Sequence, residues 1–194
     1  MTALAKRPSR PMTVEEFFVW DDEPSAKHEL VDGIPRAMAP AFQTHGRIQA
    51  TAGRLIGNHL AAKGSDCSVV VEPGIVPRVQ SATNLRVPDL AVTCAPDDPG
   101  HRAMPDPILI VEILSPSNVR ATRENIWAFT TIPSVVEIMA LHSTKLAAEL
   151  LRRRPDGSWP ELPEEIGPHG TLHLESISLE LPLAEFYAQT HLAR

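Results

Sequence analysis

Two carboxylates that sit in short apolar segments are the residues of this chain best suited to chemistry. Asp89 directly precedes the apolar residues 90–92, and Glu112 follows the apolar run 108–111. An ionised carboxylate is costly inside a buried strand unless a cation, a metal ion or hydrogen-bond donors compensate for its burial. If the two strands are neighbours, these carboxylates predict a divalent-metal site. A structural alternative stays open, in which Asp89 caps a turn and Glu112 pairs with an arginine such as Arg86.

The composition is that of an ordinary globular protein. The 194 residues, of which 43% are apolar and 22% charged, are enough for one well-buried domain. We expect residues 1–12 to form a flexible arm and residues 13–194 to form a single domain. Because Cys67 and Cys94 lack the spacing of a metal motif, they are expected to be reduced, buried thiols.

Charge and hydropathy exclude some classes of protein. The net charge of −6 argues against a protein that coats nucleic acid non-specifically, but it leaves room for a nuclease with an acidic metal site. The sequence has no apolar run of about 20 residues, and its N-terminus does not resemble a signal peptide. We therefore expect a cytoplasmic protein with no membrane span.

Hydrophobic periodicity and turn signals predict a mixed α/β domain with a central sheet. Thr13 and Glu16 form a capping box that opens a short helix. The pair Asp32-Gly33 separates two apolar runs and predicts a hairpin, and the longest helix is expected at residues 44–63. Further strands are expected at 67–72, 75–79, 87–94, 107–114, 135–141, 145–152 and 172–175, and further helices at 119–131 and 183–191.

Several short motifs, each weak alone, follow one another in the order found in a known family. They lie at residues 12–17, 28–33, 45, 87–92, 111–117, 132–137, 155–159 and 181–184. They include a Pro-Asp pair, then a loop, then a Glu at the end of the next apolar strand. In these motifs the chain resembles the PD-(D/E)XK nuclease superfamily and, more specifically, the restriction-endonuclease-like family called Uma-two.

The resemblance implies a restriction-endonuclease-like core with a central mixed sheet flanked by helices. It implies a divalent-metal-dependent DNA endonuclease in which Asp89 and Glu112 supply carboxylate ligands and Ile113 a carbonyl ligand. Mg²⁺ or Mn²⁺ is the expected cofactor, since such a cation lowers the pKa of a water and offsets charge on the phosphate. The expected partners are DNA and a second copy of the chain, with the segment 145–152 as a candidate edge for the homodimer.

Four further residues are candidates for the same site. Glu29 is either another acidic ligand, a group behind the ligands or plain surface beside the hairpin. His45 either touches a phosphate, orients a carboxylate or serves as a capping and packing residue. Arg120 and Arg123 follow Glu112 closely and are candidates for nucleic-acid binding.

The chain departs from the family pattern at the lysine. The superfamily motif places a lysine two residues after Glu112, where this chain has Leu114, and relatives carry it instead in a Glu-Lys pair on the next helix. Here that pair reads Glu124-Asn125. Asn125 is kept as a catalytic candidate because it can hydrogen-bond a water, but it cannot offset phosphate charge. Loss of one such contact costs roughly 10²–10³ in rate.

This departure leaves more than one function open. The first is a metal-dependent endonuclease, slowed by the missing lysine unless Arg120 or Arg123 replaces it. The second is a catalytically degenerate protein of the same fold that binds nucleic acid or a protein partner without cleavage. The third is a purely structural dimer module.

Overall fold

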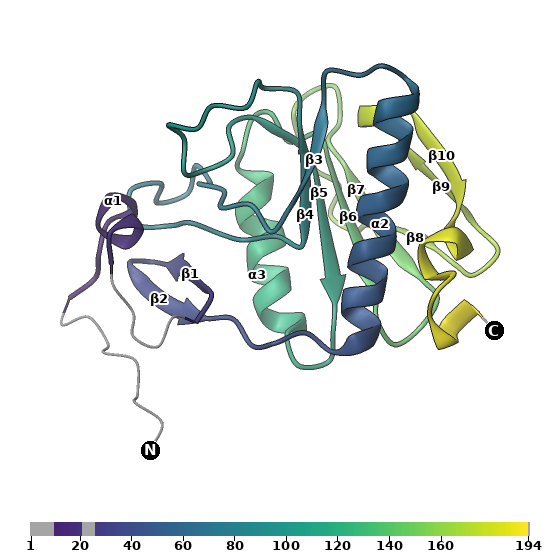
Figure 1. Cartoon of the computed structure of the whole chain (residues 1–194), viewed down its shortest axis with the longest axis horizontal. Helices are drawn as coiled ribbons and strands as arrows, with labels where there is room; N and C mark the ends of the chain where they lie inside the picture. Colours follow the sequence, from purple (N-terminus) through teal and green to yellow (C-terminus); the bar gives the residue numbers. More distant parts are fainter. Residues whose placement is uncertain (1–9, 21–25, 194) are drawn as a thin grey trace.

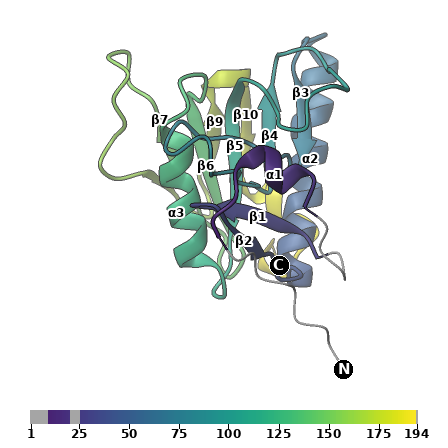
Figure 2. The ribbon, with the colours of Figure 1, turned by 90° about the vertical axis from the view of Figure 1, so that its left-hand side faces the viewer.

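A six-stranded mixed sheet forms the middle layer of the protein in the computed structural model, which describes residues 10–20 and 26–193 (Figure 1). Helix α2 (Gln43–Ala62) covers one face of the sheet and α3 (Val119–Thr130) covers the other, as the turned view in Figure 2 shows. In spatial order the strands are β3 (Ser68–Val71), β4 (Leu90–Thr93), β5 (Pro107–Leu114), β6 (Glu137–His142), β7 (Ala148–Arg152) and β8 (Glu164–Ile166). The predicted fold class is confirmed.

The two central strands are almost completely buried. β5 and β6 pair in parallel and α3 connects them, whereas the other neighbouring strands of this sheet pair antiparallel. Parallel strands covered on both faces read as continuous apolar runs, and β5 is such a run with Glu112 as its single charged residue. Glu112 is therefore buried because it lies in a central strand that is covered on both faces.

Alternation along β5 assigns its side chains to the two faces. Leu109, Val111 and Ile113 pack in the cluster that includes the apolar face of α2. Ile110 and Leu114 pack with the apolar residues of α3 in a second cluster. Glu112 lies between Ile110 and Leu114 in this alternation, so its side chain belongs to the α3 face.

The predicted N-terminal elements are confirmed. Helix α1 (Val14–Phe18) begins with the complete capping box of Thr13 and Glu16. The hairpin of β1 (His28–Val31) and β2 (Ile34–Ala37) turns at Asp32 and Gly33, which have φ values of 51° and 78°. A Cβ on Gly33 would lie 2.6 Å from Pro11 Cβ, so glycine is required there.

The hairpin docks on the segment that leads to β4. The backbone groups of Leu30 and Leu85 exchange two hydrogen bonds of 2.8 and 2.9 Å. Of the predicted arm, residues 1–9 lie outside the described residues, and Met12 is buried against the hairpin, where its N–H donates to Gly33. This docking brings Glu29 of β1 toward the sheet.

Several predicted elements differ in the structure. Residues 75–79 form no strand, because only Ile75 pairs, as an isolated bridge with Arg86. The segment 145–152 is not a sheet edge, since β7 lies between β6 and β8. The closing helix is a short 3₁₀ helix, η2 (Leu183–Tyr187), preceded by a small hairpin of β9 (Thr171–Leu174) and β10 (Leu179–Pro182).

The prediction for the cysteines is wrong. Cys67 and Cys94 form a disulfide; Cys67 is half-buried and Cys94 is exposed. The antiparallel register of β3 and β4 pairs Ser68 with Thr93, so the two cysteines face each other one step beyond. A separation of 27 residues does not reveal this pairing in the sequence. Among the described residues, no helix is long and apolar enough to cross a membrane.

Candidate active site

The two carboxylates singled out in the sequence come together at one end of the sheet. β4 and β5 are antiparallel, and Leu90 pairs with Val111. One step further along this register, Asp89 stands opposite Glu112. Directly opposite residues point to the same face of a sheet, so the fold juxtaposes the two side chains. The structural alternative in which Glu112 pairs with Arg86 is not what the structure shows, because Arg86 contacts Glu29 and Asn125 instead.

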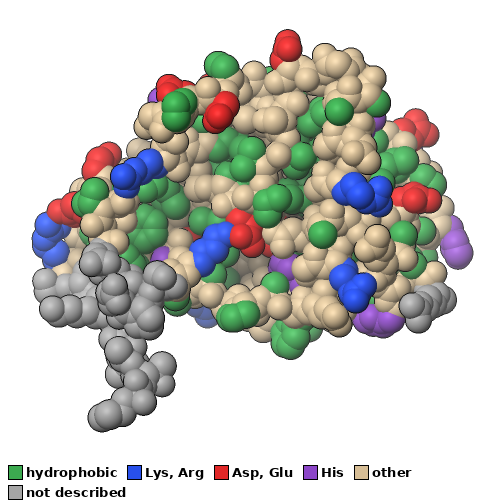
Figure 3. All heavy atoms as spheres, in the orientation of Figure 1, with side chains coloured by type: hydrophobic (Ala, Val, Ile, Leu, Met, Phe, Trp, Pro, Cys, Tyr) green, Lys and Arg blue, Asp and Glu red, His purple; other side chains and the backbone are tan. Residues whose placement is uncertain are grey.

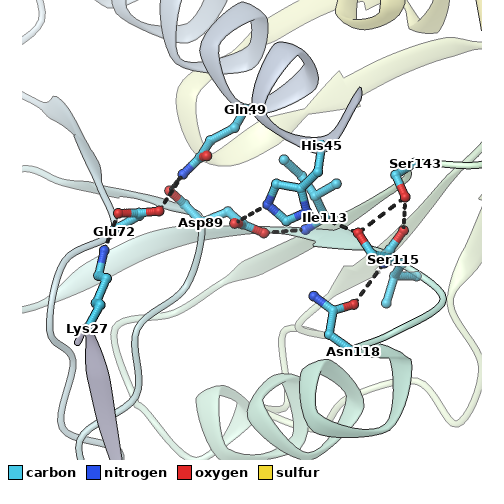
Figure 4. Close-up of polar contacts among 10 residues, drawn as sticks. Lys27, His45, Gln49, Glu72, Asp89, Ile113, Ser115, Asn118 and Ser143 are labelled. Carbon is cyan, nitrogen blue, oxygen red and sulfur yellow. Dashed lines mark hydrogen bonds and ion pairs between the residues drawn. The ribbon is translucent and has the colours of Figure 1, made fainter. Parts of the chain in front are cut away.

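Asp89 is held by donors from two different elements (Figure 4). Its Oδ1 lies 2.7 Å from Nε2 of His45, and its Oδ2 accepts a hydrogen bond of 2.6 Å from the backbone N–H of Ile113. The backbone carbonyl of Asp89 accepts from the Gln49 side chain at 3.1 Å and from the N–H of Glu72 at 3.0 Å. These contacts fix the position and the orientation of the carboxylate.

His45 lies in the first turn of α2 and is buried between two polar groups. Its Nδ1 is 3.1 Å from the Ser115 hydroxyl, which follows β5 directly. Because a carboxylate only accepts, Nε2 is the donor toward Asp89. The Ser143 hydroxyl donates to the Ser115 hydroxyl at 3.2 Å, and the Asn118 side-chain oxygen accepts from the Ser115 N–H at 2.8 Å (Figure 4). Of the roles considered for His45, its contacts are those of a group that orients a carboxylate.

Glu112 differs from Asp89 in having one carboxylate oxygen without a donor. Its side chain is buried, and its Oε1 has no hydrogen-bond partner among the residues that the structure describes. Burial raises the pKa of Glu112 well above its ordinary value, and the negative charges of Asp89 and Glu29 raise it further. A buried carboxylate oxygen without a donor is expensive, so this position calls for a proton or a cation.

Glu29 enters the site from the hairpin and is buried as well. The Asn125 amide of α3 donates to its Oε2 at 3.0 Å, and the same amide accepts from the guanidinium of Arg86 at 3.2 Å. Oε1 of Glu29 lies 3.7 Å from Arg36 and 4.0 Å from Arg86. Burial raises the pKa of Glu29, while the Asn125 hydrogen bond and the two arginines oppose the shift.

A cavity of about 610 Å³ opens over these groups. Its lining includes four carboxylates, His45 and Asn125; the carboxylates are those of Glu29, Glu72, Asp89 and Glu112. On the face viewed in Figure 3, acidic, basic and histidine side chains gather around a hollow between the β1–β2 hairpin and α2. The site is therefore accessible from outside although Glu29, Asp89 and Glu112 are largely buried.

The two basic residues that line the cavity are not those singled out in the sequence. They are Lys27, which is ion-paired with Glu72, and Arg36, which lies 3.5 Å from Glu124. Both side chains are about two-fifths exposed, at 41% and 42%. They are the cations best placed to meet a negatively charged ligand there.

Arg120 and Arg123 do not line the cavity. The Arg120 side chain is 93% exposed and pairs with Glu124 one turn later in α3. Arg123 forms two hydrogen bonds of 2.5 and 2.7 Å with the Glu149 carboxylate, which also contacts His142. Their predicted role in nucleic-acid binding stays a prediction, and neither stands in for a lysine beside Asn125.

Sequence reasoning missed several groups that surround Asp89 and Glu29. Arg86, Gln49, Ser115 and Glu72 are not among the site residues predicted from the sequence. One signal was available for Arg86: an arginine three residues before Asp89, beside apolar residues, needs an anionic partner when it is buried. Gln49 lies one helical turn after His45, on the same face of α2.

The donor set fits a hard divalent cation of the Mg²⁺ type. Among the described residues no three His, Cys, Asp or Glu side chains form a metal-binding group, but Mg²⁺ needs only one or two carboxylates because it keeps several waters. The Ile113 N–H points at Asp89, and the carbonyl of a strand residue projects to the same side as its N–H. The orphaned Oε1 of Glu112 completes a set of oxygen donors.

Comparison with known proteins identifies the family and the fold. The profile of the Uma2 family, described as "Putative restriction endonuclease", matches residues 14–187. The uncharacterized protein slr1290 from Synechocystis sp. is 29% identical over 191 residues, covering 95% of this chain and 97% of that protein. A putative nuclease belonging to DUF820 from Anabaena variabilis has the same fold, with a TM-score of 0.70 at 16% identity over 92% of this chain and 98% of its own.

Proposed function

The chain belongs to the Uma2 family of putative restriction endonucleases, and on this premise we propose that it is a divalent-metal-dependent endonuclease that hydrolyses phosphodiester bonds of DNA. The observation that carries the proposal is the pairing of Asp89 with Glu112 on the wall of an open cavity, with one Glu112 oxygen left without a donor. A merely structural carboxylate at this depth would be expected to have hydrogen-bond donors.

Asp89, Glu112 and the Ile113 carbonyl would hold Mg²⁺ or Mn²⁺. When bound, the cation lowers the pKa of a water and offsets the charge that develops on the phosphate. His45 keeps the Asp89 carboxylate oriented through its 2.7 Å contact, and Ser115 fixes the other side of the ring. The chain thus contributes ligands that are already in place, which lowers the cost of ordering them.

Glu29 is the group we assign to proton transfer. It lines the cavity, its Oε2 is fixed by Asn125, and burial raises its pKa toward the range of a useful base. Its Oε1 faces Arg36 and Arg86 at 3.7 and 4.0 Å without a hydrogen bond to either. This oxygen would accept a proton from a water in the cavity.

Lys27 and Arg36 would contact the phosphates of the DNA. Each is half-exposed in an ion pair with a glutamate, and such surface pairs contribute at most about 1 kcal/mol. A phosphate can therefore compete with the glutamate for the cation. We expect DNA affinity to fall in Lys27→Ala and Arg36→Ala, and to change less in Arg120→Ala, which lies outside the cavity.

Nicking of supercoiled plasmid in Mg²⁺ and in Mn²⁺ tests the proposal. Wild type is expected to nick in either metal and not in chelator, and Asp89→Ala and Glu112→Gln are expected to lose this activity. Asp98→Ala, a substitution in the exposed loop before β5, is the matched control and should retain it. Metal-dependent nicking that persists at full rate in both site variants would refute the assignment.

A second candidate function is favoured by one observation. Asn125 occupies the place where relatives carry a lysine, and the described cavity holds no lysine other than Lys27. A degenerate member of the family would bind DNA or a protein partner without cutting. Retardation of DNA in a gel, unchanged by Asp89→Ala and with no nicking in either metal, would identify this function. Formation of a homodimer also stays a proposal, and light scattering at several concentrations tests it.

A further inference from the structure

We propose that Arg86, acting through Asn125, is the positioning cation of this site, and that residue 125 must stay uncharged for Arg86 to act. The inference rests on the proposed function in one respect, since it concerns how Glu29 is held for that chemistry. It also makes a claim about stability that holds whether or not the protein cuts DNA. Neither the role of Arg86 nor the requirement at position 125 is evident from the family motif.

The backbone of Arg86 is fixed before its side chain enters the site. Its N–H donates to the Ile75 carbonyl and its carbonyl accepts from the Ile75 N–H, both at 2.8 Å. The side chain is only 7% exposed, so its guanidinium lies inside the protein. Burial lowers the pKa of this guanidinium, and the Glu29 charge opposes that shift. The buried cation depends on the groups around it.

The partners of this guanidinium are few. Nη1 of Arg86 donates to Oδ1 of Asn125 at 3.2 Å and lies 4.0 Å from Oε1 of Glu29. Nε is buried and has no hydrogen-bond partner among the described residues. Asn125 is thus the main acceptor for Arg86, and Glu29 is its counter-charge.

The amide of Asn125 connects a cation to an anion. Its oxygen accepts from Arg86 and its nitrogen donates to Glu29 at 3.0 Å. Asparagine has both an acceptor and donors on one short planar group, whereas lysine has three donors and no acceptor, and aspartate has acceptors only. A lysine here would deprive Arg86 of its acceptor and place a second cation beside it, and an aspartate would repel Glu29.

Arg36 does not remove this constraint. It approaches Glu29 from the solvent side at 3.7 Å, but it is 42% exposed and shared with Glu124. Arg86 is the buried cation of the pair and stands behind the carboxylate. The segment that precedes Asp89 thus brings a buried positive charge to within 4.0 Å of Glu29.

This inference reverses a simple expectation from the sequence. From the motif alone, restoring the family lysine with Asn125→Lys is expected to repair a degenerate site. Because the new lysine would lie beside the Arg86 guanidinium, Asn125→Lys should instead lower the melting temperature and leave nicking no faster than in wild type. The double variant Arg86→Gln with Asn125→Lys keeps one buried cation and one neutral amide, so it should recover at least half of the stability that Asn125→Lys loses.

The experiment is a double-mutant cycle on the full chain without metal, read as the melting temperature and followed by nicking rates in Mn²⁺. Arg86→Gln and Asn125→Lys are each expected to destabilise, and the double variant should regain at least half of the loss seen in Asn125→Lys. Arg86→Lys should keep more of the nicking rate than Arg86→Gln, with the change in kcat rather than in KM. Trp127→Lys, which adds a lysine on the exposed side of α3, is the control and should be neutral.

Additive losses in the double variant would overturn the proposal, as would an Asn125→Lys protein that is as stable as wild type. If Asn125→Lys fails to fold, recovery of folded protein in the double variant supports coupling, and its failure to fold as well refutes it. The stability cycle stands without nuclease activity. A wild type that never nicks would therefore count against the proposed function and not against this coupling.

Discussion

Replacing Glu112 with glutamine should stabilise the metal-free protein. Oε1 of Glu112 is buried without a donor, and Asp89 stands opposite on the neighbouring strand. A glutamine of the same shape removes the charge, and its amide can donate to the Asp89 carboxylate. An unsatisfied buried polar group costs about 1–3 kcal/mol, and more when it is charged. We expect a gain of about 1–3 kcal/mol at pH 8, with each kcal/mol worth roughly 2–4 °C in melting temperature for a domain of this size.

The effect should depend on pH in a defined direction. Burial holds the pKa of Glu112 well above 4.5 in the folded protein. Above the ordinary pKa the unfolded chain loses this proton while the folded chain retains it, so the folded state binds more protons and its stability falls as the pH rises. The slope for one such group is about 1.4 kcal/mol per pH unit until the raised pKa is passed. In Glu112→Gln this contribution to the slope should be absent.

Glu137 provides the matched control, because it is an equally buried glutamate on the adjacent strand. Its carboxylate accepts hydrogen bonds from Arg152 at 2.9 Å and from the backbone N–H groups of Glu175 and Ser176 at 3.0 and 2.7 Å. Glu137→Gln places an amide nitrogen against these donors and should destabilise by about 1.5–3 kcal/mol, the worth of one hydrogen bond to a charged group.

Urea unfolding at several pH values, with and without Mg²⁺, measures both variants. A ligand at 100 times its Kd stabilises by about 2.7 kcal/mol; wild type should show such a gain in Mg²⁺ and Glu112→Gln should not. A Glu112→Gln protein that loses as much stability as Glu137→Gln in chelator would refute the reasoning, because Glu112 would then be a satisfied structural carboxylate.

Three further predictions concern other parts of the chain. Reduction of the disulfide, or the substitution Cys67→Ser, should lower the free energy of unfolding by about 3–4 kcal/mol on the loop-closure model for a separation of 27 residues. Reductant should therefore lower the melting temperature of wild type and leave that of Cys67→Ser unchanged. Gly33→Ala should destabilise by at least about 1 kcal/mol in urea unfolding, because φ is positive and the added methyl meets Pro11 at 2.6 Å. Arg123→Ala should lower the melting temperature without changing DNA affinity in a gel-shift assay, since its partner is Glu149.

The elements around the site were predictable because their signals are local. The capping box of Thr13 and Glu16, the turn at Asp32-Gly33 and the long apolar run of β5 each depend on neighbours within a few residues. The opposition of Asp89 and Glu112 was a hypothesis about two strands, and it required the antiparallel register that the structure supplies. Strand pairing itself is not a local property of the sequence.

The contacts that connect the elements of the site, none of them predicted, are long-range. The bond from Asn125 to Glu29 joins residues 96 apart, and the bond from His45 to Ser115 joins residues 70 apart. The disulfide depends on the register of β3 and β4, which no local pattern fixes. The segment 75–79 has strand-like residues but pairs only through Ile75, as an isolated bridge with Arg86.

The position of Asn125 shows why a missing motif residue is weak evidence for a lost function. A motif lysine supplies charge at a place in space, and the sequence reports only its place on a helix. In this chain the Arg86 guanidinium lies 4.0 Å from the Glu29 carboxylate, and the Asn125 amide hydrogen-bonds to both. The same net charge in a buried site can be carried by different residues. The effect of a substitution at Asn125 therefore depends on the cation and the carboxylate that its amide contacts. For this protein that means testing Arg86 and Asn125 as one unit before reading Asn125 as a defect.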